Sequence, residues 1–163
     1  SSVSNVDNLK VSETFSDAID VDFGKINFQK IYCKNVNNDC FDISGGRVKG
    51  EYLEATNISD KGISFGEESI GKINLVNLKK NYLAIAVKDG SNLFIEESNL
   101  TKNDFDVSVF KKKSEFGNAK LVLNKTNNPE NLKALIGKKN EFFSEKVLNY
   151  NKVNNNFIYN FFY

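Results

Sequence analysis

The residues of this chain best suited to chemistry are aspartates that recur 22 residues apart. Asp17 and Asp39 are the clearest pair, and Asp39 lies in the segment NDCFDISGG, which also holds a thiol and two glycines. Two carboxylates facing one sugar bond are what a glycoside hydrolase needs, one protonated to serve the leaving oxygen and one to activate water. Aspartates at chain bends also have a structural use, because they accept backbone N–H bonds.

A second group of acids, Asp20, Asp22 and Asp42, is a candidate metal site, since carboxylate oxygens are the ligands that calcium takes. Further acids at the neighbouring bends are Asp17, Asp39 and Asp60. The glycine-rich calcium repeat Gly-Gly-x-Gly-x-Asp does not occur, ISGGRVKG being a poor match. A solvated acidic face is the competing interpretation, so we expect no cofactor, with calcium as the alternative.

Composition excludes several classes of function. The chain has no histidine, which rules out His-based triads, His-ligated zinc and imidazole acid–base catalysis. Its 22 basic and 21 acidic residues leave no basic footprint for nucleic acid or an anionic membrane. Cys33 and Cys40 are too few for a disulfide framework or a zinc site made only of cysteines. Small packing residues are the favoured interpretation of both, and a disulfide between them is the alternative.

The elements that must position these residues repeat along the chain with a period of 22. The repeating segments are AIDVDF from Ala18, CFDISG from Cys40, GISFGE from Gly62, AIAVKD from Ala84 and DVSVFK from Asp106. Aligned, they give two apolar columns, Ile19, Phe41, Ile63, Ile85, Val107 and Val21, Ile43, Phe65, Val87, Val109. Apolar positions two apart predict a strand with one buried face. The column between them faces outward, and its polar members Asp20, Asp42 and Ser64 are candidate ligand-binding residues.

A second motif, apolar-x-any-x-Asn-apolar, lies between these segments. It begins at Ile31, Leu53, Ile73 and Ile95 and carries Asn35, Asn57, Asn77 and Asn99, with spacings of 22, 20 and 22. We interpret it as a second strand of each coil, with the asparagine at a bend where stacked amides bond to one another and to turn backbone.

Two strand motifs per repeat resemble a right-handed parallel β-helix of the pectin-lyase-like superfamily. The prediction is an all-β chain with about five 22-residue coils over residues 16–125. The handedness rests on the resemblance and on the general preference of parallel crossovers. A leucine-rich repeat is the alternative, although such repeats carry one strand motif rather than two.

The two ends of the chain are expected to differ. Residues 1–15 are polar and form either an incomplete coil or an N-terminal cap, and the favoured expectation is that further coils precede them in a longer protein. An open coil there would allow end-to-end self-association. Residues 126–163 are predicted to be a C-terminal cap, with a short helix from Asn128 and Pro129 to Gly137 followed by further strands. Aromatic residues that could cover the core are Phe142, Phe143, Phe157, Tyr159 and Phe161.

Three segments resemble the active-site segments of the polygalacturonase family, which read Asn-Thr-Asp, Asp-Asp and Gly-His-Gly on successive coils. They are FSDAID from Phe15, NDCFDI from Asn38 and DKGISFG from Asp60. The resemblance implies Asp17 and Asp39 as the acids, but Asn38 replaces one family acid and Lys61 replaces the histidine. Lys88 follows the equivalent strand, so the catalytic candidates are Asp17, Asp39, Lys61 and Lys88. Pectate-lyase-type chemistry would combine calcium with Lys61 or Lys88.

The runs SDAIDVDF, NDCFDISGG and DKGISFGEES are also similar to β-helix segments of uncharacterised bacterial proteins, some of which accompany a spore-coat-type, CotH-like kinase domain. This resemblance implies a non-catalytic module of a larger bacterial surface or secreted protein, extracellular or in the cell envelope. We expect it to bind a glycan or protein on its flat sheet, without nucleic acid or a membrane span. A divergent polysaccharide hydrolase or lyase and a self-assembly module are the alternatives.

Overall fold

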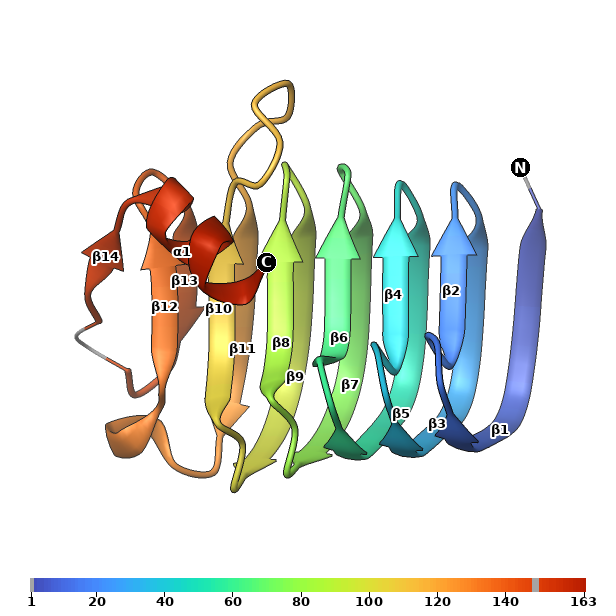
Figure 1. The fold of residues 1–163 in the computed structure, drawn as a ribbon. Helices are drawn as coiled ribbons and strands as arrows, with labels where there is room; N and C mark the ends of the chain where they lie inside the picture. The colour runs from blue at the N-terminus through green and yellow to red at the C-terminus, as the bar shows by residue number, and fades with distance from the viewer. Residues whose placement is uncertain (1, 148–149) are drawn as a thin grey trace.

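Each coil of the chain contributes one long and one short strand. The long strands of successive coils pair in parallel with one another, and so do the short strands. The computed structural model describes residues 2–147 and 150–163, and within them fourteen strands form two seven-stranded sheets. The result is a parallel β-solenoid of about six turns with a short helix near its C-terminal end (Figure 1). This confirms the predicted all-β fold, and the two strands per coil exclude the leucine-rich repeat.

The long-strand sheet has the order β1-β3-β5-β7-β9-β11-β13 and the short-strand sheet the order β14-β12-β10-β8-β6-β4-β2. The strands of the long-strand sheet are β1 (Val3–Thr14), β3 (Lys25–Val36), β5 (Arg47–Ile58), β7 (Ile70–Lys79), β9 (Asn92–Thr101), β11 (Lys120–Thr126) and β13 (Glu141–Ser144). Those of the short-strand sheet are β2 (Ile19–Asp22), β4 (Phe41–Ser44), β6 (Lys61–Gly66), β8 (Leu83–Lys88), β10 (Phe105–Phe110), β12 (Ala134–Gly137) and β14 (Lys152–Val153). The remaining elements are the 3₁₀ turn η1 (Pro129–Asn131) and the helix α1 (Asn155–Phe162).

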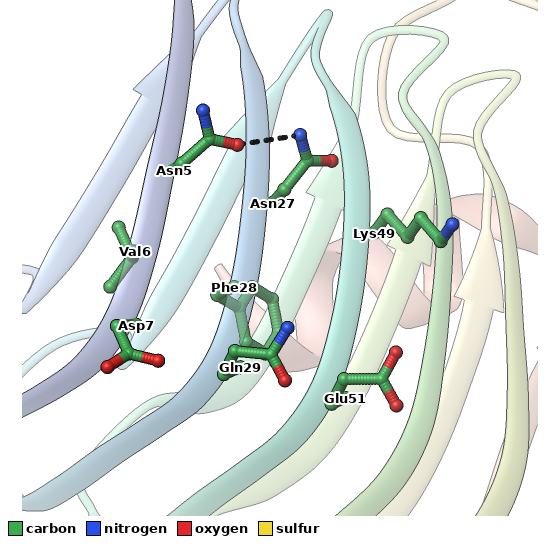
Figure 2. Close-up of a pocket in the computed structure, with 8 residues that line it drawn as sticks. All are labelled: Asn5, Val6, Asp7, Asn27, Phe28, Gln29, Lys49 and Glu51. Carbon is green, nitrogen blue, oxygen red and sulfur yellow. Dashed lines mark hydrogen bonds between the residues drawn. The ribbon is translucent and has the colours of Figure 1, made fainter.

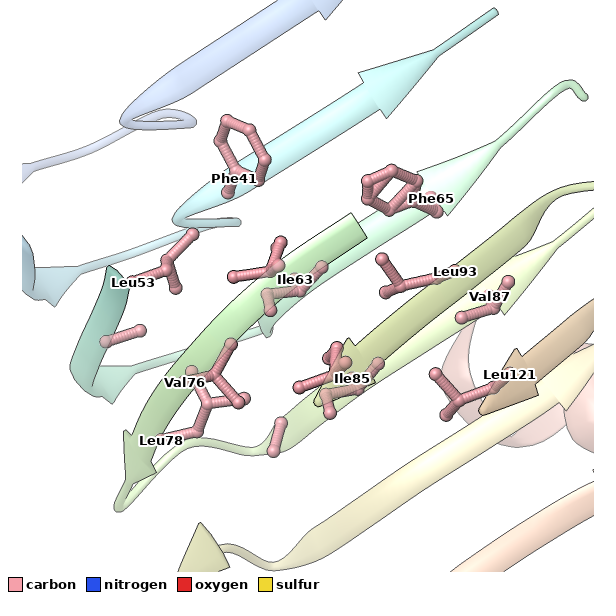
Figure 3. Close-up of a cluster of buried hydrophobic side chains, with 14 of the residues drawn as sticks. Phe41, Leu53, Ile63, Phe65, Val76, Leu78, Ile85, Val87, Leu93 and Leu121 are labelled. Carbon is pink, nitrogen blue, oxygen red and sulfur yellow. The ribbon is translucent and has the colours of Figure 1, made fainter. Parts of the chain in front are cut away.

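The short-strand sheet confirms both predicted apolar columns. Ile63 of β6 pairs with Phe41 on one side and Ile85 on the other, so the 22-residue spacing is the strand register itself. Side chains of the two columns fill the space between the sheets, where Phe41 and Phe65 are fully buried with their rings 6.5 Å apart (Figure 3). Burying a side chain of this size contributes about 1.5–3 kcal/mol, so the stacked columns are the main source of stability.

The long-strand sheet departs from the prediction at β7. Leu53 pairs with Val76 and Ala55 with Leu78, an offset of 23 residues where the aligned motifs gave 20. Val76 is accordingly fully buried, whereas Leu75, which the aligned motifs would set beside Ala55 in the core, is only half-buried. Aligning the asparagines predicts the wrong register for β7, because the strands are aligned by the apolar side chains that reach the core.

The bend at the end of each of the first five long strands is defined by a left-handed backbone rather than by asparagine. The positive-φ residues there are Glu13, Asn35, Asn57, Lys80 and Lys102. The first part of the predicted ladder exists, because Asn57 donates to Asn35 at 2.7 Å and Asn35 to Glu13 at 2.6 Å. Asn77 and Asn99 do not continue it, since they pair with each other inside β7 and β9.

The C-terminal cap also differs from the prediction. The expected helix at 128–137 is the short turn η1 followed by strand β12, because Ala134 and Ile136 pair with Val107 and Val109 of β10. The expected later strands end at β14, and Asn154 caps the helix α1 by accepting from the backbone N–H of Asn156. The pairing of 134–137 with β10 thus overrides the local helix signal.

The N-terminal end of the solenoid has an open edge. β1 pairs only with β3, and its inward residues Val6, Leu9 and Val11 are only half-buried. Phe15 and Phe23 at the neighbouring turns are 90% and 70% exposed. Self-association through this edge stays a prediction. No helix in residues 2–147 and 150–163 is long and apolar enough to cross a membrane.

The left-handed residues at the strand ends predict an effect on stability at Lys80, because its φ of 56° is unfavourable for lysine. Asparagine tolerates the left-handed region, which costs most L-residues about 1–2 kcal/mol. Lys80→Asn should therefore raise the free energy of unfolding by about 0.5–1 kcal/mol, measured by urea denaturation. Lys79→Asn, one position earlier in β7, is the control and should be neutral or destabilising. Equal effects of the two substitutions would contradict the assigned bend.

Candidate functional site

The outer face of the short-strand sheet brings most of the predicted site residues together, but not on an open surface. Asp20, Asp42 and Ser64 lie in register on β2, β4 and β6, as the sequence predicted. Asp20 is exposed and Asp42 half-buried, whereas Ser64 is fully buried. The column faces away from the core, yet from β6 onward it is covered by the C-terminal segment.

The cover is the helix α1, which packs against β12 and β10, together with Tyr163, which reaches Lys88 of β8 (Figure 1). Phe162 packs edge-on against Tyr82 and Phe105, with ring centroids 5.9 and 5.5 Å apart. Such contacts add about 0.5–1.5 kcal/mol each beyond buried area. Sequence reasoning missed this cover because α1 was expected to form strands.

Tyr163 sits among three lysines. Its ring centroid lies 4.7 Å from the Nζ of Lys61, 5.7 Å from that of Lys88 and 4.0 Å from that of Lys112. The Nζ of Lys88 donates to the Tyr163 hydroxyl at 3.1 Å and to the Ser64 hydroxyl at 2.9 Å. The catalytic candidates Lys61 and Lys88 thus share one site, and an aromatic ring from the chain's own C-terminal end occupies it.

Asp39 is the buried acid of this cluster. Its Oδ1 accepts the backbone N–H of Lys61 at 3.0 Å and lies 3.8 Å from the Lys61 Nζ. Burial raises the pKa of Asp39 to about 7, with Lys61 acting in the opposite direction and Asp60 adding to the rise. Burial alone would lower the pKa of the Lys61 ammonium, but Asp39, Tyr163 and Asp60 together raise it.

Asp17 and Asp39 belong to one ladder of turn bonds. The Oδ1 of Asp17 accepts the backbone N–H of Asp39 at 2.9 Å, just as Asp39 serves Lys61 one coil later. Each carboxylate therefore satisfies a backbone donor on the next coil, which is the structural use that the sequence allowed for bend aspartates.

The calcium candidates do not gather into a metal-binding cluster. Across the described ranges 2–147 and 150–163, no group of three or more His, Cys, Asp or Glu side chains is placed to hold an ion. Asp20 and Asp42 stand on neighbouring strands of one face. Burial raises the pKa of Asp20, and the charges of Asp22, Asp42 and Asp17 raise it further.

Cys33 and Cys40 form a disulfide, with their Cα atoms 5.8 Å apart. The bond joins β3 to the start of β4 across one bend, and both residues are buried in the core. The packing interpretation and the disulfide alternative therefore hold together, since Cys33 is in register with Ala55 of the next coil.

The outer face of the long-strand sheet is open, and sequence reasoning gave it no role. Two consecutive outward side chains interrupt the alternation of β3 after Phe28 and divide the face into two halves. In the second half, the rings of Tyr32 and Tyr52 lie 5.6 Å apart and are half-exposed. In the first half, a hollow of about 520 Å³ crosses β1, β3 and β5 (Figure 2). It is lined by Asn5, Val6, Asp7, Asn27, Phe28, Gln29, Lys49 and Glu51.

Comparison with known proteins adds no assignment to these sites. Neither protein-family models, nor curated proteins, nor solved structures gave a match to the chain. The resemblances to polygalacturonases and to β-helix segments of bacterial proteins therefore rest on the quoted residues alone.

The raised pKa of Asp39 predicts a pH dependence of stability. The folded protein keeps this proton up to about pH 7, whereas a carboxyl with the ordinary pKa of 3.8 loses it much earlier. The stability from neutral Asp39 is complete below about pH 4 and is lost as pH rises toward 7, by up to about 1.4 kcal/mol per pH unit. Asp39→Asn should remove this slope in urea denaturation between pH 4 and 8.

The control is Asp7→Asn, since the Asp7 side chain is exposed on β1, in the other sheet. It should follow the wild-type slope. A slope that survives Asp39→Asn would show that Asp39 is not its source and would contradict the prediction.

Proposed function

We propose that this chain is a non-catalytic β-solenoid module that binds glycans on the outer face of its long-strand sheet. The observation that carries the proposal is the paired, half-exposed rings of Tyr32 and Tyr52 on an open flat surface. Aromatic rings offer an apolar face to the C–H side of a sugar, and their rigidity costs little entropy on binding. An extended polymer suits a flat sheet better than a deep pocket does.

The polar groups around the rings fit the same use. The Tyr52 hydroxyl donates to the Glu54 carboxylate at 3.0 Å, and the Nζ of Lys10 lies 5.4 Å from the Tyr32 ring centroid. These contacts orient both rings before a ligand arrives, which lowers the cost of binding. Glu54 and Lys10 would also offer hydrogen-bonding partners to sugar hydroxyls at the edge of the platform.

The outer face of the short-strand sheet supports glycan binding less well. Tyr163 covers Lys61 and Lys88, and the Asp17 and Asp39 carboxylates already accept backbone N–H bonds. A hydrolase would need its acid pair free to meet a sugar bond and a water. These contacts favour a binding module over the polysaccharide hydrolase or lyase.

The disulfide favours a location outside the cytoplasm. Disulfides persist in oxidising compartments and are rare where thiols are kept reduced. The Cys33–Cys40 bond therefore supports the extracellular or cell-envelope location expected of a bacterial surface or secreted module.

Affinity electrophoresis in gels that contain single polysaccharides tests the proposal. The wild-type chain should be retarded by at least one polymer of a neutral and acidic panel, and Tyr32→Ala/Tyr52→Ala should lose at least about tenfold in affinity, equivalent to about 1.4 kcal/mol. Tyr159→Ala, a surface tyrosine of α1, is the matched control. Retardation by none of the polymers, or equal loss in the control, would contradict the proposal.

A further inference from the structure

Four cations stand together on the first half of the long-strand sheet's outer face. Lys25 of β3 is in register with Arg47 of β5, and Lys49 of β5 is in register with Lys72 of β7. Adjacent strands lie about 4.8 Å apart, so each pair brings two positive charges close together. All four side chains are exposed on the same side of the sheet.

This arrangement costs stability unless something compensates it. Like charges directly opposite on neighbouring strands are destabilising. Within the described part of the chain, none of the four cations forms an ion pair. Arg47 instead donates to the backbone carbonyls of Gly46 and Glu68. By contrast, Lys120 further along the same face lies 3.5 Å from Glu141.

The cations line a hollow rather than a bare surface. A depression of about 310 Å³ is bordered by Lys25, Asn27, Arg47, Val48, Lys49, Ile70, Gly71 and Lys72. It adjoins a second depression at Ile70 and Gly71, where Phe94 and Val122 supply an apolar shelf. The Nζ of Lys72 lies 5.6 Å from the Phe94 ring centroid, so charge and apolar surface meet at one point.

We propose that this hollow is the acid-recognition part of the glycan site, and that its ligand is a linear polysaccharide carrying carboxylate or sulfate groups. The inference rests on the proposed function and names the class of glycan. Acidic groups would neutralise the rows Lys25–Arg47 and Lys49–Lys72, and a sugar ring would lie against Ile70 and Phe94. The polymer would cross the strands, parallel to the solenoid axis along which the two hollows follow one another.

A glycan fits this surface better than a nucleic acid does. The four cations lie in one half of one sheet, and the chain as a whole has a net charge of only +1. Single-stranded DNA is therefore included in the test as a competing ligand, and the proposed ligand is a glycan.

The test is affinity electrophoresis and calorimetry with a polyuronate, its carboxyl-reduced neutral form, a sulfated glycan and single-stranded DNA. Wild type should bind the acidic glycans, more weakly as salt rises, and bind the reduced polymer at least about tenfold more weakly. Lys49→Glu/Lys72→Glu should lose acidic-glycan binding by the same factor. Lys138→Glu/Lys152→Glu, which makes the same charge change on the cap, should not. Preference for the polyuronate or for the sulfated glycan identifies the acidic group.

The outcomes separate the inference from the proposed function. The acid site would be overturned, and glycan binding left standing, by the following result. The polyuronate and its reduced form bind equally, Lys49→Glu/Lys72→Glu leaves this binding unchanged, and Tyr32→Ala/Tyr52→Ala abolishes it. Binding of none of the glycans would overturn both. Binding of DNA in preference to every glycan would overturn the glycan as occupant. Circular dichroism and thermal melting of each variant establish that lost binding is not lost folding.

Discussion

In-register stacking of coils is the constraint on which the rest of this structure depends. Parallel strands pair only when each residue lies beside its equivalent one coil away, which fixes the spacing at 22 or 23 residues through the central coils. The buried columns of Ile63 and Phe65, the Asp17–Asp39–Lys61 turn ladder and the cation rows on the surface all follow from this register. A register error would therefore misplace core, turns and site together.

The strand register can be predicted from the sequence wherever the coil length is constant and only one apolar side chain can fill each core position. From β2 to β10 every coil of the short-strand sheet keeps the period of 22, so the two apolar columns predicted their own pairing. At β7 the extra residue between Asn57 and Lys80 could be placed only by knowing which apolar side chain reaches the core. Asparagine was a misleading marker there, because the left-handed backbone at the bend is occupied by a lysine.

The cap shows a different limit, since its structure depends on contacts between segments distant in sequence. Residues 134–137 form a strand because β10 offers an unpaired edge, and α1 is held by Tyr82, Phe105 and Phe110. No local pattern shows that Tyr163 will lie on Lys88, 75 residues earlier. The structure places the candidates Asp39, Lys61 and Lys88 around one site, while the cover over that site could not be foreseen from the sequence. That cover is why function is proposed for the opposite sheet.

The proposed acid-recognition site depends on the register of β5 on β7, because this register alone sets Lys49 beside Lys72. Interstrand nuclear Overhauser contacts between backbone protons of these two strands measure it directly. Contacts that pair Lys49 with Lys72 and Thr56 with Lys79 are expected, as in the structure. Contacts that pair Leu53 with Ile73 and Asn57 with Asn77 would contradict this register, since they would restore the asparagine column and separate Lys49 from Lys72.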